Sequence, residues 1–246
     1  MDKLPISVNP VAAGWRSVLT ELSLAIVVPV FNEEAVLPEW IVKAQQWGAD
    51  ELIVVDGGST DHTCRLLADS HIRWISSILG RAAQMNAGFQ ECKSDIILFI
   101  HSDTIINSSH LLAVKQAMQD KSVVGGRFDV RLSGDGFAFR VIAYFINLRS
   151  RLSGISTGDQ CQFVRRSVFE RMGGFPEQAL MEDIEFSKRL KRYGKIACLR
   201  QKVVTSSRRW ESHGIIRTVL LMWKLRFLYW LGVSPEKLAQ AYRQAR

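Results

Sequence analysis

Several features that define common protein classes are scarce in this sequence. Only four of its 246 residues are cysteines, and the nearest two, Cys64 and Cys92, stand 28 positions apart. Because no Cys-x-x-Cys pair occurs, neither a zinc site nor a disulfide framework is expected. Scattered thiols fit a reducing compartment, which predicts a cytoplasmic protein. Residues 1–20 contain Pro5 and Pro10 and no continuous apolar core, which argues against a signal peptide.

Two common phosphate-binding motifs are also missing. Neither G-x-G-x-x-G nor G-x-x-x-x-G-K-[ST] occurs, so the usual dinucleotide-binding and P-loop interpretations lose support. The composition, with 47% hydrophobic and 23% charged residues, excludes disorder over most of the chain. The net charge of +8 indicates an anionic partner, which leaves open nucleic acid, phosphate-bearing small molecules and acidic lipid surfaces.

The first half of the chain alternates short apolar runs with segments of helical spacing. The runs predict strands at residues 24–30, 52–55, 72–76 and 96–100, and the segments predict helices at 36–47, 60–70, 80–92 and 108–120. This alternation indicates βαβ units, hence an α/β fold with a Rossmann-like, mostly parallel sheet flanked by helices.

The second half is less regular. It predicts strands at 123–132, 162–164, 196–199 and 203–205 and helices at 137–152 and 181–193. No internal repeat or low-complexity linker occurs. We therefore expect a lead-in of residues 1–22, one catalytic domain of residues 23–206 and a helical C-terminal extension of residues 207–246.

Polar residues stand at the ends of three predicted strands, where open parallel sheets bind ligands. They form the segments Asn32-Glu33-Glu34, Asp56-Gly57-Gly58 and His101-Ser102-Asp103. Asp103 is placed to hold a divalent ion that bridges two phosphates, or else to cap the next helix. Asp56 and its glycines would either contact a flat ring or only form a turn.

Three further segments have a functional and a structural interpretation. In Met181-Glu182-Asp183-Ile184-Glu185, Asp183 is a candidate general base, although three acids at a helix start also suit the helix dipole. The loop Gly158-Asp159-Gln160 would line an acceptor cleft or form a turn. Arg208 and Arg209 would clamp a pyrophosphate or form an exposed basic patch.

In combination, these segments resemble the family 2 glycosyltransferases with the GT-A fold. The matching segments are Val27–Glu34, Ile53–Asp61, the strand end at His101–Asp103 and the pair Glu182-Asp183, in the same order and with the same separations over residues 23–205. The segment Gly80–Gly88 and the tail Ser206–Tyr242 are similar to a small bacterial subgroup of that family.

The resemblance implies a role for each matching position. Pro29, Phe31, Glu33, Asp56, Arg81, Ser102, Asp103, Arg208 and Arg209 would bind the nucleotide-sugar, with UDP-sugars favoured as donors. Asp103 would also hold a Mn²⁺ or Mg²⁺ ion. Asp183 would be the base of an inverting transfer to a hydroxyl acceptor, which Asp159, Gln160 and Glu182 would contact. His101 departs from the family, because it stands where the first acid of Asp-x-Asp is expected and adds no negative charge.

Residues 215–233 form a long apolar stretch that Arg217, Lys224 and Arg226 interrupt. Since charges near the centre of a span cost roughly 2.5–3.5 kcal/mol each, crossing a membrane is unfavourable. Aromatic residues mixed with basic ones fit a helix in the membrane interface, at the inner face for a cytoplasmic enzyme with a lipid acceptor. The alternative is packing on the catalytic domain or on a second subunit of a homodimer.

Two other functions fit parts of the sequence. A nucleotidyltransferase would need a glycine-rich, basic phosphate loop after the first strand, where this chain has the acidic Asn32-Glu33-Glu34. A non-catalytic nucleotide-sugar binder or a nucleic-acid binder fits the net charge. However, the basic residues gather in residues 140–226 without an aromatic platform, so we expect no nucleic-acid partner.

Overall fold

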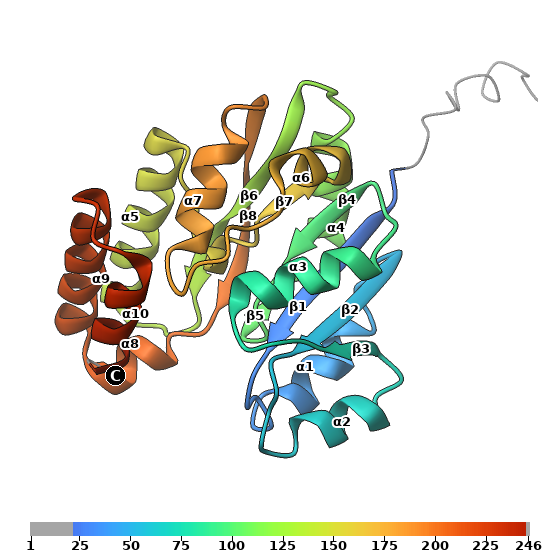
Figure 1. Ribbon diagram of the computed structural model, residues 1–246, viewed down its shortest axis with the longest axis horizontal. Coiled ribbons are helices and arrows are strands. Elements are labelled where there is room, and N and C mark those ends of the chain that lie inside the picture. The colour runs from blue at the N-terminus through green and yellow to red at the C-terminus, as the bar shows by residue number, and fades with distance from the viewer. Residues whose placement is uncertain (1–21, 245–246) are drawn as a thin grey trace, which may run out of the picture.

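The computed structural model describes residues 22–244, so the expected lead-in lies almost wholly outside the described residues. Within that range, eight strands form one sheet in the order β3-β2-β1-β4-β7-β6-β8-β5 (Figure 1). The first four run parallel, as the alternating sequence pattern predicts: β1 (Leu24–Val30), β2 (Glu51–Asp56), β3 (Arg73–Ser76) and β4 (Ile96–Phe99). The predicted α/β fold with a mostly parallel sheet flanked by helices is confirmed.

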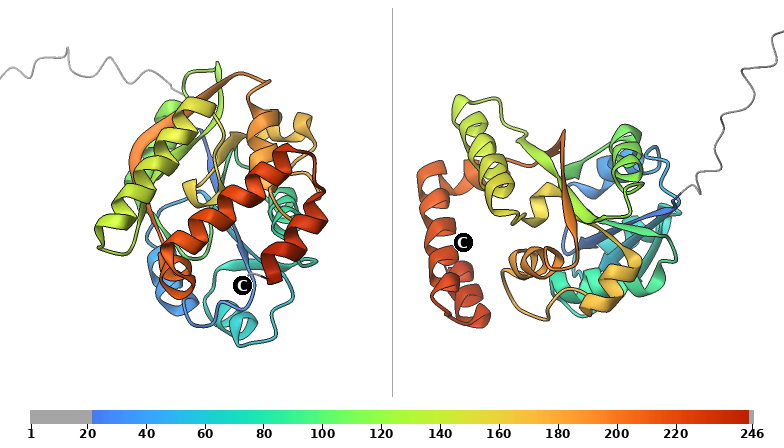
Figure 2. Two further views of the ribbon diagram at one scale, coloured as in Figure 1. Left: turned by 90° about the vertical axis from the view of Figure 1, so that its left-hand side faces the viewer. Right: turned by 90° about the horizontal axis from the view of Figure 1, so that it is seen from above.

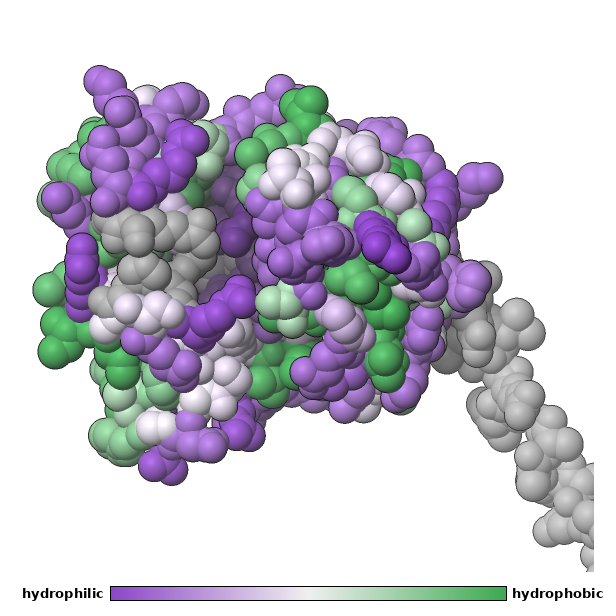
Figure 3. Space-filling view, turned by 90° about the horizontal axis from the view of Figure 1, so that it is seen from below, coloured by the Kyte–Doolittle hydropathy of each residue, from purple (hydrophilic) through white to green (hydrophobic). Residues whose placement is uncertain are grey.

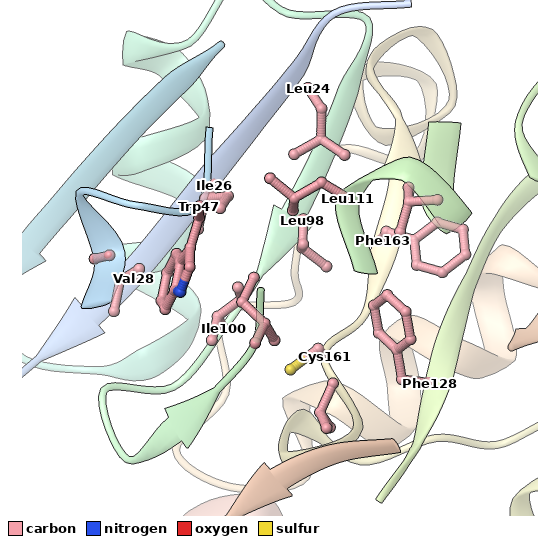
Figure 4. Packing of buried hydrophobic residues seen from close by; sticks show 14 of the residues in the cluster. Leu24, Ile26, Val28, Trp47, Leu98, Ile100, Leu111, Phe128, Cys161 and Phe163 are labelled. Carbon is pink, nitrogen blue, oxygen red and sulfur yellow. The ribbon is translucent and has the colours of Figure 1, made fainter. Parts of the chain in front are cut away.

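Helices cover both faces of this sheet because its strands are apolar on both sides. In β1, Leu24, Ile26 and Val28 belong to one buried cluster, whereas Ala25 and Val27 belong to another. The first cluster packs against α1 (Leu37–Ala44) and α4 (Ser108–Ala117), and part of it is drawn in Figure 4. The second packs against α3 (Arg81–Glu91), α6 (Arg166–Met172) and α7 (Glu182–Leu190). The remaining helix of the first half is α2 (Thr63–Asp69).

The second half of the sheet is mixed. It consists of β5 (Thr104–Ile105), β6 (Val123–Leu132), β7 (Phe163–Arg165) and β8 (Lys195–Thr205). The sequence predicted two short strands where β8 is one. The pairing with β6 passes from Leu199 to Lys202 while β6 advances by one residue, so Arg200 and Gln201 form a bulge. These polar residues interrupt the apolar pattern without ending the strand.

The C-terminal residues form three helices at one side of the sheet. These are α8 (Arg208–His213), α9 (Ile215–Trp230) and α10 (Pro235–Gln244), and they lie beside α5 (Phe137–Ser153) and α7 (Figures 1 and 2). Leu225 and Leu238 of the extension are buried with Met181 and Ile184 at the start of α7. None of the helices within residues 22–244 has both the length and the apolar composition that crossing a bilayer would need.

Candidate active site

The carboxyl ends of β1 and β2 are joined by a hydrogen-bonded turn around Asp56. Asp56 is 1% exposed, and its carboxylate accepts hydrogen bonds from the Gly58 and Ser59 N–H groups and from the Ser59 hydroxyl. The structure thus displays the turn that the sequence allowed. Contact between Asp56 and a base stays a prediction, and it requires this turn to open.

The side chain of Gln84 in α3 forms hydrogen bonds with the two strand ends beside the same turn. Sequence reasoning missed this role. The Nε2 of Gln84 donates to the carbonyl oxygens of Val30 and Val55, each at 2.8 Å, and the side chain is 3% exposed. A Cβ on Gly57 would lie 3.0 Å from the Gln84 amide, so the turn leaves little room there. The sequence offered one clue to this role, namely a glutamine within the predicted helix that contains Gly80–Gly88.

Four of the predicted donor-site residues gather where β1 and β4 end. Arg208 lies 3.9 Å from the Glu33 carboxylate, measured between its Nη2 and Oε2. Burial and the negative charge of Asp103 raise the pKa of Glu33, whereas the charge of Arg208 and a hydrogen bond with Ser102 lower it. Two carboxylates, a hydroxyl and a guanidinium therefore share one region. Phe31, at the end of β1, is 40% exposed beside it, and Pro29 is buried within β1.

The helix that follows Asp103 does not use this residue as its cap. Asn107 is the N-cap of α4 and accepts a hydrogen bond from the Ser109 N–H, while His110 completes a capping box. The alternative in which Asp103 caps this helix is therefore not supported. His101 packs against the turn at Gly158, where an added Cβ would stand 2.6 Å from the imidazole ring.

A strained residue begins α7 and fixes the orientation of the acids that follow. Met181 has φ +67°, a left-handed conformation that non-glycine residues rarely adopt. Asp183 accepts a hydrogen bond from the Gly158 N–H at 3.0 Å and one from its neighbour Ile184 at 2.7 Å. Asn32 and Cys161, which flank the same region, also have positive φ. Strain of this kind tends to gather at functional sites.

Glu182 and Asp183 form a coupled acidic pair. Burial and the charge of Asp183 raise the pKa of Glu182 to about 7, although Arg81 opposes the shift. Burial also raises the pKa of Asp183, against the Gly158 N–H and the charge of Arg226. Both carboxyls therefore hold their protons more tightly than free carboxyls do, and a raised pKa suits a general base.

Arg81 links the two halves of the site. Desolvation opposes the charge of Arg81, part of whose side chain is exposed, but the negative charges of Glu182, Tyr242, Asp183 and Asp103 raise its pKa. The segments of Asp103 and Asp183 are in contact, because the His101 ring packs against Gly158, whose N–H donates to Asp183, whereas the carboxylate of Asp56 is held in its own turn. In the space-filling view from below, a furrow separates the C-terminal helices from the α/β part of the molecule (Figure 3).

The turn at η2 (Gly158–Gln160) differs from its expected role. Gln160 is fully buried, and its side-chain amide donates to the Phe128 carbonyl and to the Ser150 hydroxyl. It holds the turn to α5 and β6 and has no exposed surface for an acceptor. The Oδ1 atom of Asp159 is buried without a hydrogen-bond partner. The side chain of Arg209, also predicted to bind phosphate, lies outside the described residues.

A divalent ion would find few protein ligands here. No group of three or more His, Cys, Asp or Glu side chains suited to a metal occurs within the described part of the chain. Asp103 and the nearby Glu33 nevertheless supply carboxylates, and Mg²⁺ commonly binds through one or two carboxylates plus substrate phosphates. These residues fit a metal that shares its ligands with a diphosphate, and not one held by the protein alone.

A separate depression lies at the opposite end of the strands. Its lining includes Lys121, Arg165 and Lys195, at the starts of β6 and β8 and the end of β7, and Arg171 of α6. No carboxylate lines it. It therefore offers neither a base nor a metal ligand, and the cluster around Arg81 remains the candidate active site.

Comparison with known proteins identifies the family. The model described as Glycosyl transferase family 2 matches residues 25–173. The undecaprenyl-phosphate 4-deoxy-4-formamido-L-arabinose transferase of Pseudomonas aeruginosa is 29% identical over 168 residues, covering 61% of this chain and 49% of that protein. The probable glycosyltransferase YdaM of Bacillus subtilis is 27% identical over 215 residues, covering 73% and 49%. The chain thus spans about half the length of these relatives.

Solved structures show the same fold. S. aureus TarS in complex with UDP-GlcNAc superposes with a TM-score of 0.58 at 19% identity, covering 75% of this chain and 58% of that one. Glucosyl-3-phosphoglycerate synthase of Mycobacterium tuberculosis, in complex with Mn²⁺, UDP-glucose and phosphoglyceric acid, gives 0.56 at 20% identity, covering 74% and 71%. The chain belongs to glycosyl transferase family 2, and its likeness to these structures shows the GT-A fold.

Proposed function

We propose that this protein is an inverting glycosyltransferase that moves a sugar from a UDP-sugar to a hydroxyl acceptor. The observation that carries the proposal is the packing of the strand end that holds Asp103 on the turn that holds Asp183: the His101 ring lies against Gly158, whose N–H donates to Asp183. One acid follows a strand of the parallel sheet and the other begins α7, so a donor and an acceptor would meet between them. The UDP-sugar complexes of two GT-A neighbours support the choice of nucleotide.

The donor would occupy the ends of β1, β2 and β4. Arg81 and Arg208 are positioned to neutralise a diphosphate, since guanidinium groups match phosphate oxygens. Pro29, Phe31, Glu33, Asp56 and Ser102 would surround the nucleoside. A Mn²⁺ or Mg²⁺ ion, held by Asp103 and the diphosphate, would offset the negative charge that grows on the leaving group.

Asp183 would act on the acceptor. Its carboxylate takes the proton of the acceptor hydroxyl as that oxygen bonds to the anomeric carbon. The bond between that carbon and the diphosphate breaks on the opposite face, so the nucleoside diphosphate leaves and the anomeric configuration inverts. Two backbone N–H groups hold the carboxylate in place for this step. Glu182 and Asp159 would border the acceptor.

A thermal-shift series tests the donor part of this proposal. UDP-, GDP-, CDP- and dTDP-sugars are added to the protein with Mn²⁺ or Mg²⁺, and the melting temperature is measured. A ligand that binds only the native state raises it by mass action. Stabilisation by UDP-sugars above the others supports the proposal, and a flat response to all four contradicts it.

The residues 207–246 would place this enzyme at the inner face of a membrane. One side of α9 exposes a stripe of large apolar residues at helical spacing, namely Ile216, Leu220, Trp223, Phe227 and Trp230. Trp223 is 67% exposed and Trp230 is 76% exposed, and Arg217 and Lys224 lie nearby in sequence. Aromatic and basic residues on one helix suit an interfacial position, which fits an acceptor carried by a lipid. A homodimer contact is the competing outcome.

A further inference from the structure

Two arginines from different helices, Arg149 and Arg226, adjoin residues that pack on the segments around Asp183. Arg149 belongs to α5, next to Ser150, whose hydroxyl holds Gln160 of the η2 turn. Arg226 belongs to α9, next to Leu225, which is buried with Met181, Ile184 and Ile155. The packing of α9 therefore brings Arg226 to the start of α7. Burial and the positive charge of Arg226 lower the pKa of Arg149 to about 10.

Neither arginine has a matched counterion. Among the described residues, no carboxylate oxygen lies within 4.0 Å of either guanidinium. The Nη2 atom of Arg149 is buried without any hydrogen-bond partner. Burying a guanidinium nitrogen unpaired beside a like charge is unfavourable, so the arrangement calls for an anion.

The neighbouring charges do not supply that anion. Arg127 of β6 is paired with Asp129 at 2.5 Å, and Arg151 takes the other oxygen of Asp129 at 2.7 Å. Asp183 is held by backbone N–H groups, and Asp159 keeps an unpartnered oxygen. These two acids act on Arg149 only through space, where they raise its pKa less than burial and Arg226 lower it.

We propose that Arg149 and Arg226 bind a phosphate group of the acceptor, beside the hydroxyl that Asp183 deprotonates. Two guanidinium groups from different directions suit a tetrahedral phosphate, which offers several oxygens. This inference rests on the proposed function. The phosphate is an anchor and takes no part in the bonds that form and break, which remain those of the sugar transfer. It is distinct from the donor diphosphate, whose expected partners Arg81 and Arg208 lie with Glu33 and Asp103.

Calorimetric titration with sn-glycerol 3-phosphate tests the site, with and without saturating UDP. The variants are Arg149→Gln and Arg226→Gln, and the control is Arg140→Gln, an exposed arginine of the same α5. We expect each variant to weaken binding of the probe by about tenfold, and the control to leave it unchanged. UDP affinity should be the same in all four proteins. If Arg149→Gln does not fold, because part of this side chain is buried, Arg226→Gln still tests the inference.

A vesicle arm identifies the source of the phosphate. Phosphatidylcholine vesicles with and without phosphatidic acid are compared by flotation, using the same four proteins. Phosphate-dependent binding that both variants lose assigns the site to a lipid headgroup, and loss confined to the soluble probe assigns it to a free phosphate ester. Equal behaviour of all four proteins in both arms overturns the inference, as does complete displacement of the probe by UDP. Failure of the wild type to bind UDP would instead contradict the proposed function. The titration with sn-glycerol 3-phosphate in the absence of UDP would still test whether Arg149 and Arg226 bind a phosphate.

Discussion

At the scale of single residues, the candidate active site is held by hydrogen bonds between residues far apart in the chain. Asp183 could be singled out because it lies in a run of acids at a helix start. Its contact with the Gly158 N–H joins residues 25 positions apart, and no local pattern encodes it. Similarly, Asp56 was found, but its burial inside its own turn depends on Gln84 from another helix. The local sequence shows which residue types are present, whereas tertiary packing determines their exposure and their hydrogen-bond partners.

The raised pKa of Glu182 predicts a stability that falls as pH rises. Below the ordinary value of 4.5 the side chain is protonated in both the folded and the unfolded states, so it costs nothing. Between 4.5 and about 7 the unfolded chain loses this proton first, which destabilises the folded state progressively. The variant Glu182→Gln removes that penalty.

Urea unfolding of the wild type and Glu182→Gln measures the effect. The two should be similarly stable at about pH 4.5, and the variant should gain on the order of 1–3 kcal/mol by about pH 8. Glu185→Gln, on the same helix but paired with Arg189, is the control that should show no such gain. A variant that becomes less stable than wild type at high pH would contradict the assignment.

Gly158 is predicted to be intolerant of a side chain. A Cβ there would lie 2.6 Å from the His101 ring, so Gly158→Ala should destabilise the protein by about 1–3 kcal/mol and reduce turnover by moving the N–H that holds Asp183. Thermal denaturation and donor turnover are the measurements. The double variant Gly158→Ala/His101→Ala should recover most of the stability. Absence of recovery would show that the two residues are not in contact.

At the scale of elements, continuous apolar runs predicted the positions of strands better than runs that contain polar residues. The four strands of the parallel half and β6 lie where the pattern predicted them, and in β1 and β4 burial on both faces makes the apolar run continuous. The bulge at Arg200 and Gln201 divided β8 into two predicted strands. The short helix α6 was missed, since seven residues directly after β7 give no clear helical period. The extension was expected to be helical, but its division into three helices was not.

Close packing of α3 on the sheet gives a prediction at this scale. A Cβ on Gly88 would stand 2.4 Å from a methyl of Val27 and 2.9 Å from a methyl of Val55, and both valines are fully buried. Gly88→Ala should therefore lower the free energy of unfolding by about 1–3 kcal/mol despite the higher helix propensity of alanine. Gln90→Ala, exposed on the same helix, should change it by less than about 0.5 kcal/mol. Equal effects would show that α3 does not pack so closely.

At the scale of the whole molecule, function depends on segments far apart in the chain. The parallel strands and the polar residues at their carboxyl ends could be anticipated from the βαβ pattern, whereas the order of the strands in the sheet could not. The placement of Arg149 and Arg226 could not be anticipated either, because it depends on how the C-terminal helices pack on the rest of the molecule. The furrow between these helices and the sheet is a property of the assembled molecule (Figure 3).

The exposed stripe of α9 predicts binding to membranes. Trp223→Ser/Phe227→Ser should reduce flotation with anionic vesicles while circular dichroism stays unchanged, because both side chains are exposed. Ile78→Ser/Leu79→Ser alters two other exposed apolar residues and serves as the matched control. If the stripe is instead a dimer contact, the first variant will change the sedimentation coefficient and leave vesicle binding as it was.

The release of UDP from a UDP-sugar tests the central claim most directly, because it follows the bond that Asp183 is proposed to help break. With water or an added alcohol as acceptor, the wild type should release UDP, and Asp183→Asn should be slower by roughly 10²- to 10⁴-fold. The affinity for UDP should remain nearly the same, since the amide keeps the shape of the carboxylate. Turnover retained by Asp183→Asn would contradict the assignment of Asp183 as the base and the account built on it.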